Sequence, residues 1–140
     1  MFEAVGVGDV LPESPVSITA TLIVAGAIAS RDYQDVHHDR DLAIRRGSPD
    51  IFMNILTTVG LCGRYISDWA GPEARLRRAA IRLGAPNYPH DTMTMSGSVQ
   101  SKGEGSGDGA VQIVVRGRNR LGDHVTGIID VDLPIGDPSG

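Results

Sequence analysis

A carboxylate and an imidazole five residues apart are the side chains of this sequence best suited to chemistry. Asp32 and His37 lie in the polar run 31–40, which follows an apolar stretch and precedes a segment with helical spacing. Two such groups on a short excursion between rigid elements can converge on one water molecule, one accepting a proton while the other orients the water or returns the proton. The pattern favours acid–base chemistry on water; a solvated polar loop is the alternative.

Strand-like and helix-like segments flank this pair. Residues 16–23 alternate between apolar and small polar side chains, which predicts a β-strand, while residues 24–30 lose the alternation and leave their structure open. The tripeptide Ser-Pro-Asp at 48–50 is typical of a helix start. Because apolar residues then recur at three- and four-residue spacings, we expect a long central helix from Pro49 to Trp69.

Four strand-like segments follow this helix. Turn-rich segments separate them, so consecutive hairpins and an antiparallel sheet are expected. The glycine-rich segment 102–109 is expected to be a mobile hairpin loop, because it lacks the strand-to-helix setting of a phosphate loop. The expected strands cover residues 80–83, 92–99, 111–116 and 125–131. This order of elements predicts an α+β domain in which an antiparallel β-sheet wraps around a long central helix.

Length, charge and cysteine content restrict the class of protein. The 140 residues, 41% of them hydrophobic, fit one domain over residues 1–140. The net charge of −4 and the lack of a basic stripe argue against a nucleic-acid partner. The longest apolar stretch, 18–29, is too short for a membrane span and has no basic segment before it, so a cytoplasmic protein is expected. The single cysteine, Cys62, is expected to be buried and unreactive.

The polar run carries a recognisable pattern. From Asp32 to Asp39 it reads Asp-Tyr-Gln-Asp-Val-His-His-Asp, and Ala43 follows. This resembles the signature of the MaoC-like enoyl-CoA hydratases, which is Asp, then Asn and often Pro, then His, with a further Asp and a small residue downstream. Gln34 and Asp35 stand in place of the Asn and Pro. The family has the hotdog fold, which the resemblance implies here.

The resemblance extends over nearly the whole chain. Segments 8–12, 61–69 and 119–125 also match the family, and 31–40 and 67–72 are similar to the small MaoC-like subunits of actinobacterial hydratases of cholesterol side-chain degradation. It implies an enoyl-CoA substrate with a steroid acyl group and, because CoA is part of the substrate, no cofactor. It also implies a larger MaoC-like partner subunit, in a heterodimer or heterotetramer, that widens the acyl pocket.

The resemblance assigns roles to four residues. Asp32 and His37 would share one water in a syn hydration. The family often has His-Gly in the first helical turn, where a backbone amide binds the thioester carbonyl, and the matching register here is Asn54-Ile55. An amide is present whatever the side chain, and amides at a helix N-terminus suit a developing oxyanion. We therefore expect Asn54 and Ile55 to bind the substrate.

Other side chains are weaker candidates. His38 is an alternative catalytic histidine, but next to His37 in an extended segment it should point away. His90 and His124 lie in turn-like contexts and are expected to be solvated. No metal site is expected, since hydration needs no metal. The arginines that could contact CoA phosphates, or form solvated faces, are Arg45, Arg46, Arg75, Arg77, Arg78, Arg116, Arg118 and Arg120.

Two other functions remain open. An acyl-CoA thioesterase on the same fold would call for a carboxylate on the central helix, and residues 51–67 contain no Asp or Glu. A non-catalytic partner subunit would be expected to have a degenerate pair, whereas Asp32 and His37 are both present. The hydratase is the hypothesis that the sequence favours.

Overall fold

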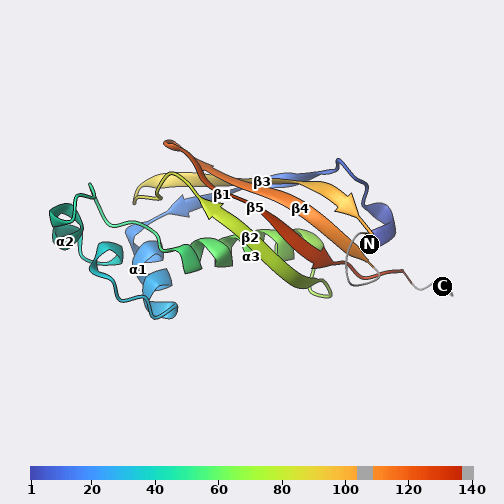
Figure 1. The fold of residues 1–140 in the computed structure, drawn as a ribbon, viewed down its shortest axis with the longest axis horizontal. Helices are drawn as coiled ribbons and strands as arrows, with labels where there is room; N and C mark the ends of the chain where they lie inside the picture. Colours follow the sequence, from blue (N-terminus) through green and yellow to red (C-terminus); the bar gives the residue numbers. More distant parts are fainter. Residues whose placement is uncertain (104–108, 137–140) are drawn as a thin grey trace.

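A five-stranded antiparallel sheet packs against one long helix in this computed structural model, which describes residues 1–103 and 109–136 (Figure 1). The strands are β1 (Val10–Ile18), β2 (Arg75–Leu83), β3 (Asp91–Lys102), β4 (Ala110–Asn119) and β5 (Gly122–Asp132), in the spatial order β1-β3-β4-β5-β2. The helices are α1 (Ala20–Ala29), α2 (Arg40–Arg45) and α3 (Ile55–Ala70), with short 3-10 turns η1 (Phe2–Ala4) and η2 (Asp35–His37). The predicted α+β class and the antiparallel sheet are confirmed.

The core lies between α3 and the inner face of the sheet. Buried residues alternate with more exposed ones along β4, as expected where one face of a sheet is covered. Cys62 on α3 lies in this core, and its burial raises the pKa of the thiol to about 11. A thiol with so high a pKa is a poor nucleophile, so the prediction of a buried, unreactive cysteine is confirmed.

The prediction of a strand over 16–23 is wrong beyond Ile18. The Thr19 hydroxyl accepts a hydrogen bond from the Leu22 amide at 3.0 Å, which caps α1 and starts a helix where the apolar alternation suggested extended chain. The small residues of α1 then serve close packing. A Cβ on Gly26 would stand 2.1 Å from Thr57 Oγ1, so only glycine permits this approach of α1 to the start of α3.

The prediction that the long helix begins at Pro49 is also wrong, because α3 begins at Ile55 with Asn54 as its N-cap. The Ser48 hydroxyl donates to the Asp50 carbonyl, and Asp50 Oδ1 accepts from the amide of the next residue, so the side chains that suggested a helix start form a local turn instead.

The later strands follow the sequence pattern. All four predicted segments lie within β2, β3, β4 and β5, and the hairpins β3–β4 and β4–β5 are confirmed. The expected hairpin between the first two segments is wrong, because β2 pairs antiparallel with β5 and not with β3. The predicted mobile loop at 102–109 lies largely outside the described residues. Within the described part of the chain, no helix is both long and apolar enough to cross a membrane.

Candidate active site

Asp32 follows the end of α1, where the chain turns sharply. The Arg31 amide donates to the Ile28 carbonyl at 3.0 Å and the Asp32 amide to the Ala27 carbonyl at 2.9 Å, the two bonds of a Schellman motif. Arg31 adopts a left-handed conformation, with φ at 55°, in a position where glycine is the usual residue. The helix terminus therefore fixes the backbone of Asp32 at the cost of some strain.

The ring of His37 is oriented by the segment that leads into α3. Its Nδ1 lies 2.6 Å from the Phe52 carbonyl oxygen, which can only accept, so Nδ1 carries a hydrogen. The Phe52 ring packs edge-on against the imidazole with 5.0 Å between centroids. The Phe52 amide in turn donates to the Val36 carbonyl. These contacts leave Nε2 as the nitrogen free for proton transfer.

Asp32 and His37 face each other. His37 Nε2 lies 3.3 Å from Asp32 Oδ2, with the imidazole side chain 7% exposed and the carboxylate 21% exposed. Asp32 Oδ1 accepts from the Gln34 amide at 3.3 Å, and Oδ2 accepts from Asn54 Nδ2 at 3.2 Å. A partly open carboxylate beside a nearly buried imidazole suits acid–base work on one water. The structure thus brings together the two residues that the sequence singled out; their catalytic role stays a prediction.

An ion pair fastens the loop that joins them. Arg46, just after α2, places Nε 2.8 Å from Asp35 Oδ1 and Nη2 2.8 Å from Asp35 Oδ2, a two-point contact. The hydrogen bond from Arg46 lowers the pKa of Asp35, so the carboxylate stays charged. Asp35 occupies the position where the MaoC-like signature often has proline. Its contact with Arg46 links η2 to the end of α2.

The first turn of α3 presents backbone donors beside the pair. The Asn54 side chain is occupied by internal hydrogen bonds. The amides of Ile55 and Leu56, at the first two helical positions, have no hydrogen-bond partner among the described residues. They are therefore the donors that could meet a thioester oxygen. Leu56 was not singled out from the sequence, because its place in the first turn depends on locating the cap at Asn54.

His38 and His90 lie apart from this pair. Both are exposed, as predicted for His90, and both line a cavity of about 360 Å³ that Asp32 and His37 do not line. His38 is therefore not placed to replace His37.

The prediction that His124 is solvated is wrong. The side chain lies in the core with 2% exposure; its Nδ1 donates to the Ala85 carbonyl at 2.7 Å, and its Nε2 accepts from the Thr58 hydroxyl at 2.8 Å. Burial lowers the pKa of His124, which favours the neutral ring. The turn-forming residues 118–123 end just before it, and His124 is the first buried residue of β5.

Several of the arginines considered for CoA contacts form ion pairs at the surface. These pairs are Arg46 with Asp35, Arg77 with Asp132, Arg116 and Arg118 with Asp123, and Arg120 with Asp91. Such exposed pairs stabilise a fold only weakly and leave the guanidinium groups accessible.

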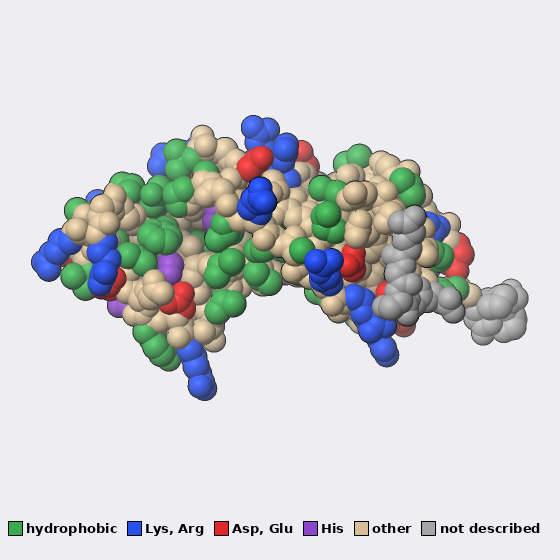
Figure 2. Space-filling model, in the orientation of Figure 1, with side chains coloured by type: hydrophobic (Ala, Val, Ile, Leu, Met, Phe, Trp, Pro, Cys, Tyr) green, Lys and Arg blue, Asp and Glu red, His purple; other side chains and the backbone are tan. Residues whose placement is uncertain are grey.

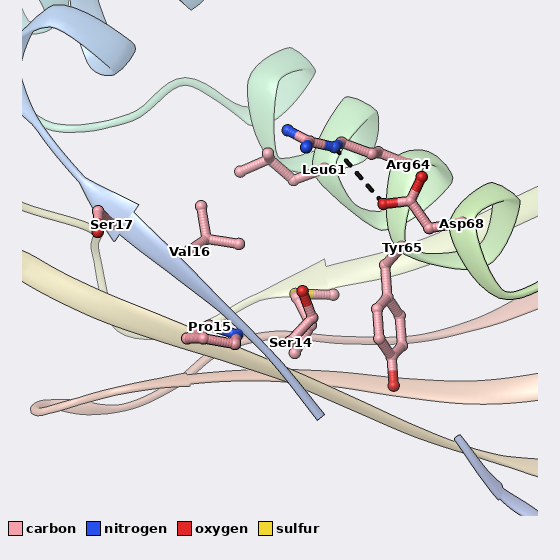
Figure 3. Close-up of a pocket in the computed structure, with 9 residues that line it drawn as sticks. Ser14, Pro15, Val16, Ser17, Leu61, Arg64, Tyr65 and Asp68 are labelled. Carbon is pink, nitrogen blue, oxygen red and sulfur yellow. Dashed lines mark ion pairs between the residues drawn. The ribbon is translucent and has the colours of Figure 1, made fainter. Parts of the chain in front are cut away.

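A separate cavity of about 230 Å³ lies between β1 and α3 (Figure 3). It is lined by Ser14, Pro15, Val16, Ser17, Leu61, Arg64, Tyr65, Asp68 and Met95. Arg64 and Asp68 form an ion pair at 3.6 Å on the helix side. Because neither Asp32 nor His37 lines it, this cavity is not the place where the pair would meet a substrate.

Comparison with known proteins gives the family. The chain is 50% identical, over 127 residues, to a Mycobacterium tuberculosis protein named 3-oxo-4,17-pregnadiene-20-carboxyl-CoA hydratase beta subunit, and the match covers 91% of this chain and 95% of that protein. The chain belongs to the MaoC-like hydratase family. A chain in the crystal structure of the ChsH1-ChsH2 complex from Mycobacterium tuberculosis is also 50% identical to this MaoC-like chain, with a TM-score of 0.86 and coverage of 92% and 98%.

More distant structures show the same hotdog fold. The (R)-hydratase from A. caviae involved in PHA biosynthesis is 19% identical, with a TM-score of 0.84 and coverage of 94% of this chain and 99% of that one. A MaoC-like dehydratase is 23% identical, with a TM-score of 0.82 and coverage of 95% and 42%. No model of a known protein family matches the chain. The resemblance to MaoC-like hydratases and the expected hotdog fold are confirmed.

Proposed function

We propose that this chain is the small catalytic subunit of an enoyl-CoA hydratase that adds water across the α,β double bond of a steroid side-chain CoA thioester in cholesterol degradation. The observation that carries the proposal is the Asp32–His37 pair beside the free amides that begin α3. The name of the Mycobacterium tuberculosis relative, a hydratase of a pregnadiene-carboxyl-CoA, supports the steroid class.

The reaction follows from where charge develops. The pair removes a proton from water as the oxygen attacks the β-carbon, and the electrons of the double bond move through the α-carbon to the thioester oxygen. The Ile55 and Leu56 amides would stabilise the negative oxygen at the positive end of the helix. The α-carbon then takes a proton from the pair. Because the pair takes one proton from water and returns one to the α-carbon, it starts and ends the cycle with the same number of protons.

The proposal includes no cofactor and no metal. Both hydrogens and the oxygen come from water, no electrons leave the substrate, and CoA enters as part of it. The cytoplasm is the proposed compartment, which suits a single unoxidised thiol buried in the core.

A second subunit is part of the proposal. All residues of β2 except Ile81 are exposed, and among the described residues the strand has one neighbour, β5. This edge strand also exposes the apolar side chains of Leu76 and Leu83. Natural proteins usually cover such an edge. The solved relative is a two-protein complex. We propose a larger MaoC-like partner, in a heterodimer or heterotetramer, that pairs along this edge.

Apolar side chains near the pair also call for a cover. Four large apolar side chains close in sequence to Asp32 and Asn54 are exposed: Ile28, Tyr33, Ile55 and Leu56. Figure 2 shows hydrophobic side chains gathered over the end of the molecule that carries α1 and α2. An acyl group held between this chain and its partner would remove them from water.

Thioester hydrolysis is the second candidate, and the helix argues against it. Asp68 is the one acidic residue of α3; it is paired with Arg64 and lies about 20 Å along the helix from Ile55. That distance separates the only helix carboxylate from the amides that would hold the thioester. Nucleic acid and membrane are not among the proposed partners.

The test is an assay of the co-purified assembly with steroidal and short enoyl-CoA thioesters. Hydration removes the absorbance of the conjugated thioester without releasing free thiol, whereas hydrolysis releases thiol. The proposal requires loss of absorbance without thiol, fastest with the steroidal substrate and abolished by Asp32→Asn. Thiol release at the same rate as the absorbance change would refute it. A fully active Asp32→Asn assembly would instead leave this chain a non-catalytic partner.

A further inference from the structure

The Asn54 side chain joins the helix cap to the proposed catalytic pair. Asn54 is 2% exposed, and its Oδ1 accepts from both the amide and the hydroxyl of Thr57. Its Nδ2 donates to Ser30 Oγ at 2.8 Å and to Asp32 Oδ2 at 3.2 Å. Both donors and both acceptor sites of the amide are therefore used.

The orientation of this amide is set by the backbone. The opposite orientation would aim the NH₂ group of Asn54 at the Thr57 amide, which is itself a donor. Ser30 adds a second constraint: its hydroxyl donates to the Gly26 carbonyl at 2.7 Å, so its lone pairs face Asn54. The nitrogen of Asn54 must therefore point toward the end of α1, where Asp32 lies.

The carboxylate has few other supports. Asp32 Oδ1 meets the Gln34 amide at 3.3 Å, and Oδ2 meets His37 Nε2 at 3.3 Å, both at the long end of hydrogen-bond distances. The Asn54 contact, at 3.2 Å, is the shortest of the three. Among the side chains that the structure describes at Asp32, Asn54 is the amide donor, and its other hydrogen bonds, to Ser30 and Thr57, set its orientation.

We infer that Asn54 is a positioning residue that aims the Asp32 carboxylate at His37 by holding it to the N-terminal cap of α3. The inference rests on the proposed hydratase function. Through one amide group, formation of the helix start and orientation of the carboxylate are coupled, and the Ile55 amide stays at a fixed distance from the pair. Binding of the thioester carbonyl falls to the helix amides, since the Asn54 side chain is fully occupied.

Two substitutions separate positioning from capping. Ser is a good N-cap but cannot reach Asp32 with a donor, so Asn54→Ser should keep the thermal midpoint close to wild type while kcat falls roughly ten- to a hundredfold and KM changes little. Asn54→Asp keeps size and cap but sets a second carboxylate against Asp32, so kcat should fall further. Thr19→Ala is the matched control, because it removes the cap of α1 at the end remote from the pair and should lower stability without lowering kcat.

An exchange of the two side chains tests the contact itself. Asn54→Asp combined with Asp32→Asn restores one amide and one carboxylate, so the double variant should regain the thermal stability that Asn54→Asp loses, yet remain inactive. All rates are measured on the co-purified assembly with the enoyl-CoA that wild type hydrates fastest. Unchanged kcat in Asn54→Ser, together with an inactive Asp32→Asn, would overturn this inference alone. An active Asp32→Asn would overturn the proposed function instead.

Discussion

Two buried histidines flank the first turn of α3, and they differ in one partner. In both, Nδ1 donates to a backbone carbonyl, Phe52 for His37 and Ala85 for His124, so both rings have the same tautomer. At Nε2, His37 faces the Asp32 carboxylate at 3.3 Å, whereas His124 accepts from the Thr58 hydroxyl at 2.8 Å.

The difference in partner decides what each ring can do. The Thr58 hydroxyl donates to Nε2 of the neutral His124 ring, and burial lowers the pKa of His124, so the ring stays neutral. This ring is therefore a structural link between α3 and β5. The carboxylate beside His37 is itself a proton acceptor and is open to solvent, so a water can enter and exchange protons with the pair. The same tautomer-fixing contact therefore supports packing in one place and acid–base chemistry in the other.

The largest expected effect lies at the open pair. Asp32→Asn and His37→Ala should each lower kcat by about 10² or more while the assembly still forms, because each removes one half of the proton-transfer unit. Single-turnover rates on the co-purified assembly, with size-exclusion chromatography for assembly, measure both quantities. If both variants turn over at the wild-type rate, the pair is not the catalytic unit.

His124 should show the opposite profile. Leucine fills a volume similar to that of histidine, but His124→Leu leaves the Ala85 carbonyl and the Thr58 hydroxyl without a hydrogen-bond partner in the core. This should lower the free energy of unfolding by about 2 kcal/mol. Denaturant titration measures that loss, and kcat of the folded assembly should stay within a few-fold of wild type. A hundredfold loss of kcat with normal stability would move the catalytic role to His124.

The pH dependence of stability should also come from the core histidine. Burial holds the pKa of His124 below its ordinary value of 6.5, so as pH falls below about 6.5 the unfolded chain takes up a proton that the folded chain does not. The free energy of unfolding should therefore decrease toward acid pH, by at most about 1.4 kcal/mol per pH unit from this group. Denaturant titrations of wild type and His124→Leu between pH 7 and pH 5 would show the steeper loss in wild type; parallel curves would contradict this assignment.

The smallest effect is expected at His38. This ring is exposed and lines a cavity that the pair does not reach, so His38→Ala should change kcat less than twofold. Steady-state assays beside His37→Ala provide the comparison. A collapse of activity in His38→Ala with a silent His37→Ala would exchange the roles of the two neighbours.

The residue types in the sequence pointed to the Asp32–His37 pair, but not to the contacts that position it. Asp32 and His37 stand out because a carboxylate and an imidazole share one short polar run at the family spacing, and the structure brings them together. The Schellman turn at Arg31 and the Asn54 contact depend on where α1 ends and α3 begins. The sequence pattern leaves the end of α1 open. It places the start of the long helix at Pro49 instead of Ile55, because local hydrogen bonding at 48–50 competes with helix formation.

The first strand shows a similar limit. The sequence pattern starts this strand at residue 16, yet β1 begins at Val10 and includes Pro12 and Pro15. An edge strand tolerates proline because it needs its ladder on the β3 side only. The register shift between Leu11 and Ser14 absorbs the irregularity. By contrast, the four later strands were predicted because their apolar residues alternate and clear turn signals separate them.

A double-mutant cycle on Asp32 and His37 tests the central claim most directly. If the two side chains act on one water as a single unit, Asp32→Asn combined with His37→Ala should lower kcat no further than the more damaging single change, within about threefold. If the two losses multiply in the double variant, the residues act independently and the shared-water account is contradicted.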